Sequence, residues 1–587
     1  MYNLPTSAAM HFKRIQERLA QRSKQGLVFT KLYDLLRDKR FVWLALSKVL
    51  ANDGAKTPGI DQMTRDDLKS AEQKERFVKA IWGALRRKTY QPSPVRRIYI
   101  PKPSGEQRPL GIPTLRDRVV QEMLRLILEP IYESKFYRHS YGFRPFRATH
   151  HAAVEIHWLI ARHQYNYIVE GDICKCFDRI QQNLLLKILR RTIQDERILV
   201  LLKKLLRAGV MEDEAWRATD EGTPQGGVVS PLLANIYLND LDWFIAAKWD
   251  LLTPTEKKKR RYHGTECPMY LVRYADDFVI VLKATQEQAE SVKQEIGTFL
   301  QKELGLELST TKTLVTPVTA GFDFLGFNIR KYQRVALIKP SRKATERFKA
   351  EVRKRVRTGF AHGDQAGILH LNRYLLGWGA YYRRVSSSDT FAKLDHYVWQ
   401  TVWQWTERLR GVKPRNRSRR KHYARHLIPY RFDLHKPNRK SKGRHYGIWV
   451  DEAQTAAYIV TSLYLQNIQY VRRHPQLHPY LLDEREILAR KVKMLLPPKG
   501  GKPDLPTWDR YGPEWEAIRQ EALRRADNRC TQCGEPLSGR RATVHHKRKL
   551  KNFTSRQQAH RLENLVVLCP QCHLVLEKTS GAETRSA

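Results

Sequence analysis

The feature that most constrains the fold of this chain is a pair of aspartates between two apolar runs, in MYLVRYADDFVIVL. This pattern predicts an antiparallel hairpin with strands 269–274 and 278–282 and a tight turn at Ala275, Asp276 and Asp277. Adjacent carboxylates among apolar strands are costly unless a cation neutralises them. The motif therefore predicts either a plain Asp-containing turn or a metal site.

A third aspartate points to a metal site. Asp172 ends another expected strand, YNYIVEGDI (165–173). Addition of a nucleotide to a 3′-hydroxyl uses two divalent cations about 3.5–4 Å apart, one on the attacking oxygen and one on the leaving pyrophosphate. Carboxylates on rigid strands are suitable oxygen ligands for such cations. Asp172, Asp276 and Asp277 are therefore candidate Mg2+ ligands of a polymerase.

The net charge agrees with a nucleic-acid substrate. The chain has 587 residues, with 106 Lys and Arg against 60 Asp and Glu, which gives a formal charge of +46. The length excludes a small secreted scaffold and suggests about four domains. A hydrophobic content of 41% excludes disorder throughout the chain. Because self-repulsion of this size is tolerated mainly beside a polyanion, the charge argues against an ordinary small-molecule enzyme.

Cysteine spacing and hydropathy indicate a cytoplasmic protein. The N-terminus lacks the apolar core of a signal peptide. The longest uncharged stretch, 453–471, is rich in Gln, Thr, Ser and Asn, so no membrane span is expected. Four of the seven cysteines form two C-x2-C pairs, a metal-site spacing that points to a reducing compartment.

Periodicity predicts a mixed α+β chain with several domains. Helices are expected over about 10–50 and over 118–132, 181–193, 196–208 and 341–410, and a strand over 95–102. Helix 118–132 is expected to have one apolar face, formed by Val119, Met123, Leu126, Ile127 and Ile131. The stretch 411–444 carries 13 Lys or Arg against one acid, Asp433, which predicts contact with nucleic acid or mobility.

Further sequence blocks surround the three aspartates in a fixed order. They are TPGID (57–61), RRIYIPKPSGEQRPLGIPTLRDRVVQ (96–121), SYGFRP (140–145), GTPQGG (222–227), LSTTKT (308–313) and FDFLGFNI (322–329). This ordered series resembles the reverse transcriptases encoded by group II introns, and the resemblance covers nearly the whole chain. It implies a right-hand polymerase with fingers and palm that uses Mg2+ and deoxynucleoside triphosphates (dNTPs).

The resemblance implies roles for residues around the aspartates. Asp172 and Asp276 match the two main metal ligands, and Asp277 matches the third acidic residue. Phe177 matches a bulky ring that would clash with the 2′-hydroxyl of a ribonucleotide; the alternative is a core Phe.

The remaining positions of the polymerase site are cations and a glycine turn. Lys102 and Arg108 match residues that hold the triphosphate, where a cation offsets the developing charge. Gln225 and Gly226 match the turn that lines the nucleotide and template. Lys312 resembles a lysine proposed to protonate the leaving pyrophosphate.

The segment 372–405 resembles the family's maturase, or X, domain, which also serves as the polymerase thumb. Its aromatic and basic residues could stack on unpaired bases and bind phosphates. They are Trp378, Tyr381, Tyr382, Arg383 and Arg384. Most of the aromatic rings are instead expected in a helix-bundle core. By resemblance, this region binds the intron RNA, and the following basic tract binds DNA.

The two C-x2-C pairs predict a closed structural Zn2+ site in the C-terminal module. The four thiolates are those of Cys530, Cys533, Cys569 and Cys572. So short a module cannot build a large core, and a metal would compensate. Read alone, this pattern is a zinc ribbon without catalytic content.

Histidines around the cysteines resemble the HNH, or ββα-metal, nucleases. By that resemblance, His545 and His573 hold a divalent ion and His546 is the general base. Asn564 orients the loop that carries the base. A neutral imidazole can accept a proton from water near pH 7 while the metal stabilises the phosphoryl oxygens.

Together these resemblances imply a multifunctional intron-encoded protein of the bacterial cytoplasm, associated with the nucleoid or a ribonucleoprotein. It would bind group II intron RNA and target DNA, copy RNA into DNA, assist splicing and nick DNA during intron mobility. The expected domains are a basic helical extension (1–50), fingers and palm (51–335), a thumb/maturase domain (336–415), a basic DNA-binding region with linker (416–505) and a zinc-stabilised HNH module (506–587).

Three alternatives stay open at this point. The first is a splicing maturase with a dormant polymerase, against which the three retained aspartates argue. The second is a free-standing reverse transcriptase of the retron or host-defence type, against which the 372–405 block and the HNH module argue. The third is an HNH homing endonuclease with an inert N-terminal region.

Overall fold

The computed structural model of the chain consists of two compact units, 1–430 with 443–496 and 431–442 with 497–587, and each is described by itself. The structure describes residues 6–101, 105, 107–212, 215–217, 222, 226–263, 267–333, 335–359 and 364–409 of the chain, followed by 446–449, 456–459, 478–481, 515–537, 543–546, 560–569 and 572. No described helix is long and apolar enough to cross a lipid bilayer.

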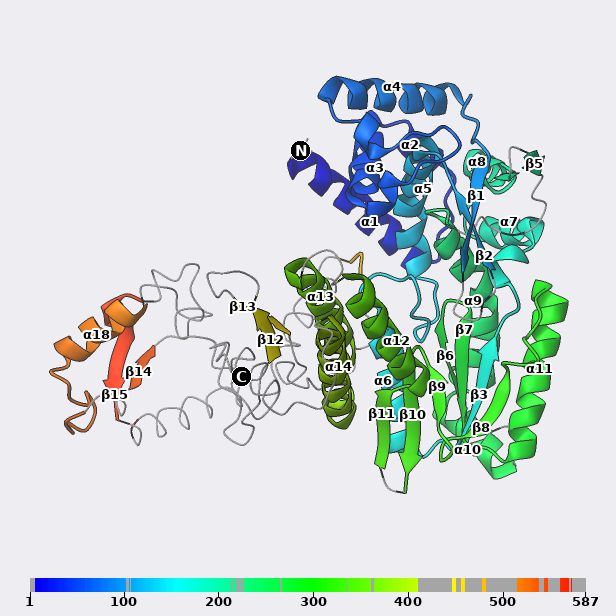
Figure 1. Cartoon of the computed structure of the whole chain (residues 1–587). Coiled ribbons are helices and arrows are strands. Elements are labelled where there is room, and N and C mark those ends of the chain that lie inside the picture. The colour runs from blue at the N-terminus through cyan, green and yellow to red at the C-terminus, as the bar shows by residue number, and fades with distance from the viewer. Residues whose placement is uncertain are drawn as a thin grey trace. The chain divides into compact units, whose positions relative to one another are not determined.

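A four-stranded antiparallel sheet forms the centre of the first unit (Figure 1). Its strand order is β6 (Met269–Tyr274), β7 (Asp277–Leu282), β3 (Tyr167–Asp172) and β8 (Leu314–Pro317). The predicted hairpin and the predicted strand at 165–173 are thus confirmed, within two residues at each end. The apolar run of β7, FVIVL, is continuous because both faces of the sheet are covered.

The two faces of this sheet pack into different cores. Phe278, Ile280 and Leu282 of β7 enter the larger core, whereas Val279 and Val281 enter a second one. This division follows from the alternation of side chains along a strand. Helices α9 (Ser230–Lys248) and α11 (Gln286–Leu304) contribute to the larger core, and α6 (Thr149–His163) contributes to the second.

Helix α5 (Leu115–Glu133) lies at the centre of the N-terminal helices α1 (Thr6–Lys24), α3 (Lys39–Ala51) and α4 (Ala71–Arg87). The expected helix is confirmed, and the five apolar residues expected near one of its faces are all buried. Nearly all of α5 is buried, including its acidic residues. Those acids are partnered inside the protein: Asp117 accepts a hydrogen bond from Tyr90, and Arg125 pairs with Glu122 and Glu129.

A second sheet, of order β2-β1-β4-β5, continues from these helices. Strand β1 (Val95–Pro101) confirms the strand predicted at 95–102, and it pairs antiparallel with β2 (Gln107–Ile112). Strand β4 (Val210–Glu212) runs parallel to β1 and pairs with β5 (Ala215–Arg217). Shorter elements complete this part: α2 (Tyr33–Leu36), α7 (Gln182–Arg190), α8 (Glu196–Leu206), α10 (Pro254–His263) and the 3-10 turns Asp53–Lys56, Arg65–Asp67 and Cys176–Asp178.

A third sheet and three helices follow the central sheet. The sheet has the order β11 (Val335–Pro340), β10 (Phe327–Tyr332), β9 (Phe322–Phe324). The helices α12 (Arg342–Gly359), α13 (Asp364–Tyr382) and α14 (Ser388–Leu409) confirm the helical expectation for 341–410. They share a core that includes Phe348, Val352 and Val356 of α12 and Leu394, Val398 and Val402 of α14. The four-residue spacing of both sets places each on one helix face.

The end of α13 packs against the turn between β9 and β10. The hydroxyl of Tyr381 donates to the carbonyl of Leu325 (3.1 Å), and that of Tyr382 donates to the carbonyl of Gly326 (3.1 Å). Trp378 and Tyr381 pack partly buried against the second core, and Tyr382 is buried in it. These three aromatics are therefore core residues, as expected for most rings of this cluster.

Two short segments from further along the chain also belong to the first unit. Strands β12 (Tyr446–Trp449) and β13 (Ala456–Ile459) form an antiparallel hairpin. Residues 478–481 lie on α5: His478 Nε2 is 2.9 Å from Ser134 Oγ, and the Tyr480 hydroxyl contacts Glu129. The basic tract 411–444 lies outside the described residues.

The second unit contains helix α18 (Trp515–Arg525), the 3-10 turn Leu562–Asn564 and an antiparallel hairpin. The hairpin strands are β14 (Thr543–His546) and β15 (Leu565–Leu568). Its small core combines Ala522 and Leu523 of α18 with Leu565 and Val567 of β15 and the cysteines 530 and 569.

Candidate functional site

The three aspartates meet at one end of the central sheet. Asp172 ends β3, Asp277 begins β7, and the two are directly opposite in the antiparallel register. Side chains at directly opposed positions lie on the same face, with Cβ atoms about 4.5–5.5 Å apart. Asp276 is the neighbouring residue in the turn that joins β6 to β7. The fold therefore brings all three candidate metal ligands to one place.

The turn is one residue shorter than the sequence suggests. Tyr274 pairs with Asp277, so only Ala275 and Asp276 form the loop, and the placement of Asp277 in the turn is wrong. Two-residue hairpin loops need a positive φ in their first position, because their twist then matches that of the strands. Ala275 has φ +60°, a conformation that is uncommon for a residue other than glycine. Surrounding contacts must hold this turn in place.

A buried arginine supplies one of these contacts. Arg273 of β6 is fully buried and forms two hydrogen bonds of 2.6 Å with the carboxylate of Asp242 on α9. Its third nitrogen donates to the side-chain oxygen of Asn235 and to the carbonyl of Ala275, both at 2.9 Å. Arg273 thus ties the turn before Asp276 to helix α9.

The loop 139–147 supports the same turn from the other side. The Asn235 side chain donates to the carbonyl of Gly142 (2.8 Å), and Tyr141 N donates to the carbonyl of Arg273 (2.8 Å). A side chain at position 142 would place its Cβ 2.3 Å from the amide nitrogen of Ala275. Only glycine permits this approach of the two backbones.

The carboxylates of the site repel one another. Burial and the negative charges of Asp276 and Asp172 raise the pKa of Asp277 to about 6, whereas Lys312 and Arg108 oppose this rise. Burial also raises the pKa of Asp276, as does the charge of Asp172. A cation bound among the three carboxylates would reverse both effects. The donor set therefore fits a hard divalent cation.

Lys312 lies in the same site. Its Nζ is 2.9 Å from Oδ2 of Asp172, and its side chain is 69% exposed. The turn that carries it is fixed to β3, because Ser309 N donates to the carbonyl of Asp172 (2.8 Å). An exposed lysine with a mobile amine can reach a substrate beside this carboxylate.

Three of the other predicted substrate-binding residues are described: Arg108, Gly226 and Phe177. Arg108 is exposed on β2 and acts electrostatically on Asp276 and Asp277. Gly226 has φ +113°, and a Cβ there would lie 2.5 Å from the carbonyl of Gly111 on β2. Phe177 packs half-buried against the larger core. Lys102 and Gln225 lie outside the described residues.

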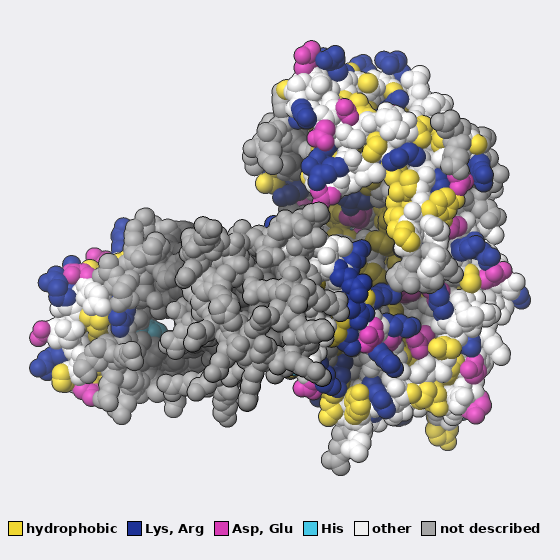
Figure 2. Space-filling view, in the orientation of Figure 1, with side chains coloured by type: hydrophobic (Ala, Val, Ile, Leu, Met, Phe, Trp, Pro, Cys, Tyr) yellow, Lys and Arg dark blue, Asp and Glu magenta, His cyan; other side chains and the backbone are white. Residues whose placement is uncertain are grey.

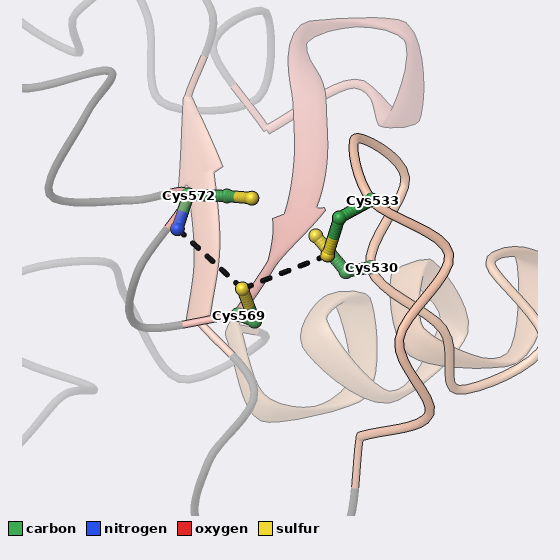
Figure 3. A group of neighbouring side chains, drawn as sticks. All are labelled: Cys530, Cys533, Cys569 and Cys572. Carbon is green, nitrogen blue, oxygen red and sulfur yellow. Dashed lines mark hydrogen bonds between the residues drawn. The ribbon is translucent and has the colours of Figure 1, made fainter.

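Four cysteine sulfurs of the second unit converge (Figure 3). The sulfurs of Cys530, Cys533, Cys569 and Cys572 all lie within 4.8 Å of one another, and Cys533 and Cys569 are 3.8 Å apart. Tetrahedral Zn2+ with bonds of about 2.3 Å needs sulfur separations of about 3.8 Å. Among the residues that the structure describes, this is the one group of three or more potential ligands that meets so closely.

The local backbone favours the thiolate of one of these cysteines, Cys530. Burial would raise the pKa of Cys530, but N–H groups of residues 569, 533 and 532 stabilise its thiolate and lower the pKa to about 6. The neighbouring sulfurs raise the pKa of Cys572 to about 12, so this thiol keeps its proton unless a cation binds. The cluster is thus suited to zinc.

The described part of the predicted nuclease site lies on the adjacent hairpin. His545 and His546 are on β14, where His546 pairs with Leu565 of β15. Asn564 immediately precedes Leu565, so the fold brings its position beside that of His546. The side chain of His546 and all of His573 lie outside the described residues.

Three residues that support the polymerase site escape sequence reasoning: Arg273, Asp242 and Asn235. Arg273 could have been noticed as the single cation inside the apolar strand MYLVRY, because a buried cation needs a buried partner. The partner, on α9, could not be identified from that signal.

The sequence matches three family profiles. They are "Reverse transcriptase (RNA-dependent DNA polymerase)" over 100–329, "Group II intron, maturase-specific domain" over 345–424 and "HNH endonuclease" over 530–578. The first profile spans the central sheet with its three aspartates, and the second begins within α12. The third contains the four cysteines.

Curated relatives match about half of this chain. Protein YkfC of Escherichia coli is 38% identical over 50% of this chain and 81% of its own length. The group II intron-encoded protein LtrA of Lactococcus lactis is 36% identical over 57% of this chain and 62% of its own length, so the match covers less than two thirds of LtrA. With these relatives and the three matched domains, the chain belongs to the group II intron-encoded proteins that combine a reverse transcriptase, a maturase-specific domain and an HNH endonuclease domain.

Proposed function

We propose that this protein copies RNA into DNA, assists the splicing of its group II intron RNA and nicks the DNA into which that intron moves. The observation that carries the proposal is the convergence of Asp172, Asp276 and Asp277 at the end of β3 and β7. This carboxylate site stands in a chain with matched maturase and nuclease domains.

In the polymerase, the three aspartates would hold Mg2+, which would activate the primer 3′-hydroxyl and stabilise the leaving pyrophosphate. The protein's own groups complete the site. Arg108 would bind the triphosphate of the incoming dNTP, together with Lys102. Lys312 would donate a proton to the pyrophosphate from its position beside Asp172.

The remaining contacts select the nucleotide. The ring of Phe177 would exclude the 2′-hydroxyl of a ribonucleotide. Gly226 would line the nucleotide and template where its backbone approaches β2, together with Gln225. Arg273 would keep Asp276 in position through the carbonyl of Ala275.

In this scheme the central sheet is the palm, the β1–β2 pair belongs to the fingers, and α12 to α14 form the thumb and the maturase domain. Figure 2 shows Lys and Arg side chains gathered over α12, whose exposed cations include Arg347, Arg353 and Lys354. Such a row of cations suits the phosphates of folded intron RNA. The partner of this region would therefore be group II intron RNA.

The second unit would act on target DNA as a ββα-metal nuclease. Zn2+ in the four-cysteine cluster would hold the hairpin that carries the histidines. His545 and His573 would bind a second divalent ion, and Asn564 would orient the loop of the base His546. The nicked strand would supply the 3′-hydroxyl from which the polymerase copies the intron. The site of action would be a ribonucleoprotein at the nucleoid of a bacterial cytoplasm.

Two variants test this division of labour. Asp276→Asn is expected to abolish extension of a DNA primer on an RNA template with Mg2+ while DNA nicking persists, and His546→Ala is expected to do the reverse. Loss of both activities in either variant would contradict the modular assignment. If the unaltered protein promotes splicing but never extends a primer, the dormant-polymerase maturase becomes the better account.

A further inference from the structure

One aromatic side chain beside the carboxylate turn is exposed in a conformation that a bulky residue rarely adopts. Phe143 is 54% exposed and has φ +56°. Left-handed backbone is uncommon for residues other than glycine, and such outliers cluster where the surrounding structure serves a function. Phe143 does not belong to either of the two large hydrophobic cores, so core packing does not account for its position.

The flanking residues hold this conformation firmly. Arg144 is buried and pairs with Glu133 through hydrogen bonds of 2.6 to 3.1 Å. The same guanidinium donates to the carbonyls of Tyr137 (2.7 Å) and Ser140 (2.8 Å). On the other side of Phe143, the carbonyl of Gly142 accepts from Asn235. The loop is thus fixed on both sides of the one residue that it exposes.

The loop that carries Phe143 lies next to the turn that contains Asp276. Gly142, the residue before Phe143, contacts the backbone of Ala275 so closely that no side chain would fit between them. Ala275 in turn precedes Asp276. A template–primer duplex whose 3′ end reaches Asp276 must therefore pass beside the loop that carries Phe143.

We propose that Phe143 is a stacking contact for the template–primer duplex, which it binds through a base or sugar face near the growing end. Aromatic stacking suits a polymerase because every base has a π-face, so the contact tolerates any sequence. A ring held on a rigid loop loses little conformational freedom on binding. This inference rests on the proposed polymerase activity and adds to it a substrate contact.

The test measures binding of an RNA template annealed to a DNA primer, without dNTPs, to variants at this position. Phe143→Gly removes the ring and keeps a residue that accepts φ +56°. It is expected to raise the dissociation constant roughly tenfold, the scale of one base–aromatic contact. Phe143→Trp should bind within twofold of the unaltered protein, and the melting temperature of Phe143→Gly should not fall.

A matched control is Tyr262→Ala, which removes a ring that is 87% exposed on α10. It should leave duplex affinity unchanged, because α10 precedes β6 at the end of the strand opposite the aspartates. Single abasic sites walked along both strands should locate the partner: one site should weaken binding to the unaltered protein but not to Phe143→Gly. Equal affinity of Phe143→Gly and the unaltered protein would overturn the inference. If the unaltered protein binds the duplex but never extends it, the proposed polymerase activity fails, whereas the binding comparison still decides the role of Phe143.

Discussion

Lys312 and Asp172 form an ion pair of 2.9 Å at the centre of the candidate polymerase site, although they are 140 positions apart in the chain. The lysine is mostly exposed, and an exposed pair of this kind contributes at most about 1 kcal/mol to stability. A structural role therefore explains the presence of Lys312 poorly. Its position beside a metal-ligand candidate suits a role in chemistry.

Replacement of Lys312 should accordingly slow nucleotide addition without unfolding the protein. Lys312→Ala is expected to lower the single-turnover rate roughly 100-fold, the low end for loss of a general acid. Lys312→Arg keeps the charge but does not release a proton, so it should be similarly slow. Rapid-quench primer extension measures both rates. Lys293→Ala, which breaks an exposed pair with Glu290 on α11, is the control, and equal rates in all four proteins would exclude the proton-donor role.

The mutual repulsion of the carboxylates predicts a pH-dependent need for Mg2+. Because the pKa of Asp277 is raised to about 6, a proton competes with the cation below that pH. The Mg2+ concentration for half-maximal extension should fall as pH rises from 5 to 7. Asp277→Asn should flatten this dependence, and a slope that persists in that variant would assign the titration to another group.

The same shift has a consequence for stability without Mg2+. The folded pKa of about 6 lies above the value of about 3.9 expected for an unfolded Asp. Asp277 thus binds its proton more tightly in the native state than in the unfolded state. The free energy of unfolding should therefore fall as pH rises from 4 to 6. Urea titrations at fixed pH check this, with Asp277→Asn expected to show a shallower fall. Added Mg2+ should restore stability at pH 7.

The Arg273–Asp242 pair predicts a separation of stability from activity. Arg273→Met leaves Asp242 buried without its partner and should cost about 3–5 kcal/mol of unfolding free energy. The double variant Arg273→Met/Asp242→Leu removes both charges and should recover most of that loss. It still lacks the hydrogen bond to the carbonyl of Ala275, so primer extension should stay low. Full recovery of extension in the double variant would show that Arg273 only stabilises the fold.

Loss of zinc should affect one unit of the protein. Cys569→Ser removes one candidate zinc ligand. It is expected to lower the amount of zinc bound per protein and to make the second unit more sensitive to protease. Primer extension should persist, because the carboxylate site belongs to the other unit. Cys267→Ser alters a buried cysteine of the first unit and should leave the zinc content unchanged. A fall of extension in Cys569→Ser with Mg2+ present would show that the two units depend on each other.

The half-buried ring of Phe177 predicts the sugar preference of the polymerase. Phe177→Ala should raise incorporation of ribonucleotides relative to deoxynucleotides roughly tenfold, the scale of one steric contact. Phe177→Tyr keeps the ring and should retain the preference. Competition between labelled nucleotides in one extension reaction measures the ratio, and an unchanged ratio in Phe177→Ala would remove Phe177 from this role.

Sequence reasoning is successful where local patterns determine structure. The strands β3, β6 and β7 follow from their short apolar runs, and the meeting of Asp172 with Asp277 follows from their positions at strand ends. The start of β7 is different. A two-residue turn normally has glycine or asparagine at the position with positive φ, but here Ala275 adopts φ +60°. Without such a residue, the sequence suggests a longer loop.

Long-range polar contacts are the part that sequence reasoning misses. In α5, the carboxylates of Asp117 and Glu129 are buried, and their partners lie elsewhere in the chain. Tyr90, 27 positions before Asp117, and Tyr480, 351 positions after Glu129, donate to them. Arg273 likewise depends on α9, more than 30 residues earlier in the chain. Such partners are determined by the tertiary fold, and no local periodicity encodes them.

The hydroxyl contacts of Tyr381 and Tyr382 with the β9–β10 turn have a practical consequence for protein engineering. A minimal polymerase cut after β11, at Pro340, would strip two rings from Leu325, Gly326 and Phe327 and leave an apolar surface in water. Such a fragment should aggregate. The smallest soluble enzyme that can be made from this chain must therefore retain α13, so shortening cannot remove the helices proposed to bind RNA without also damaging the polymerase part.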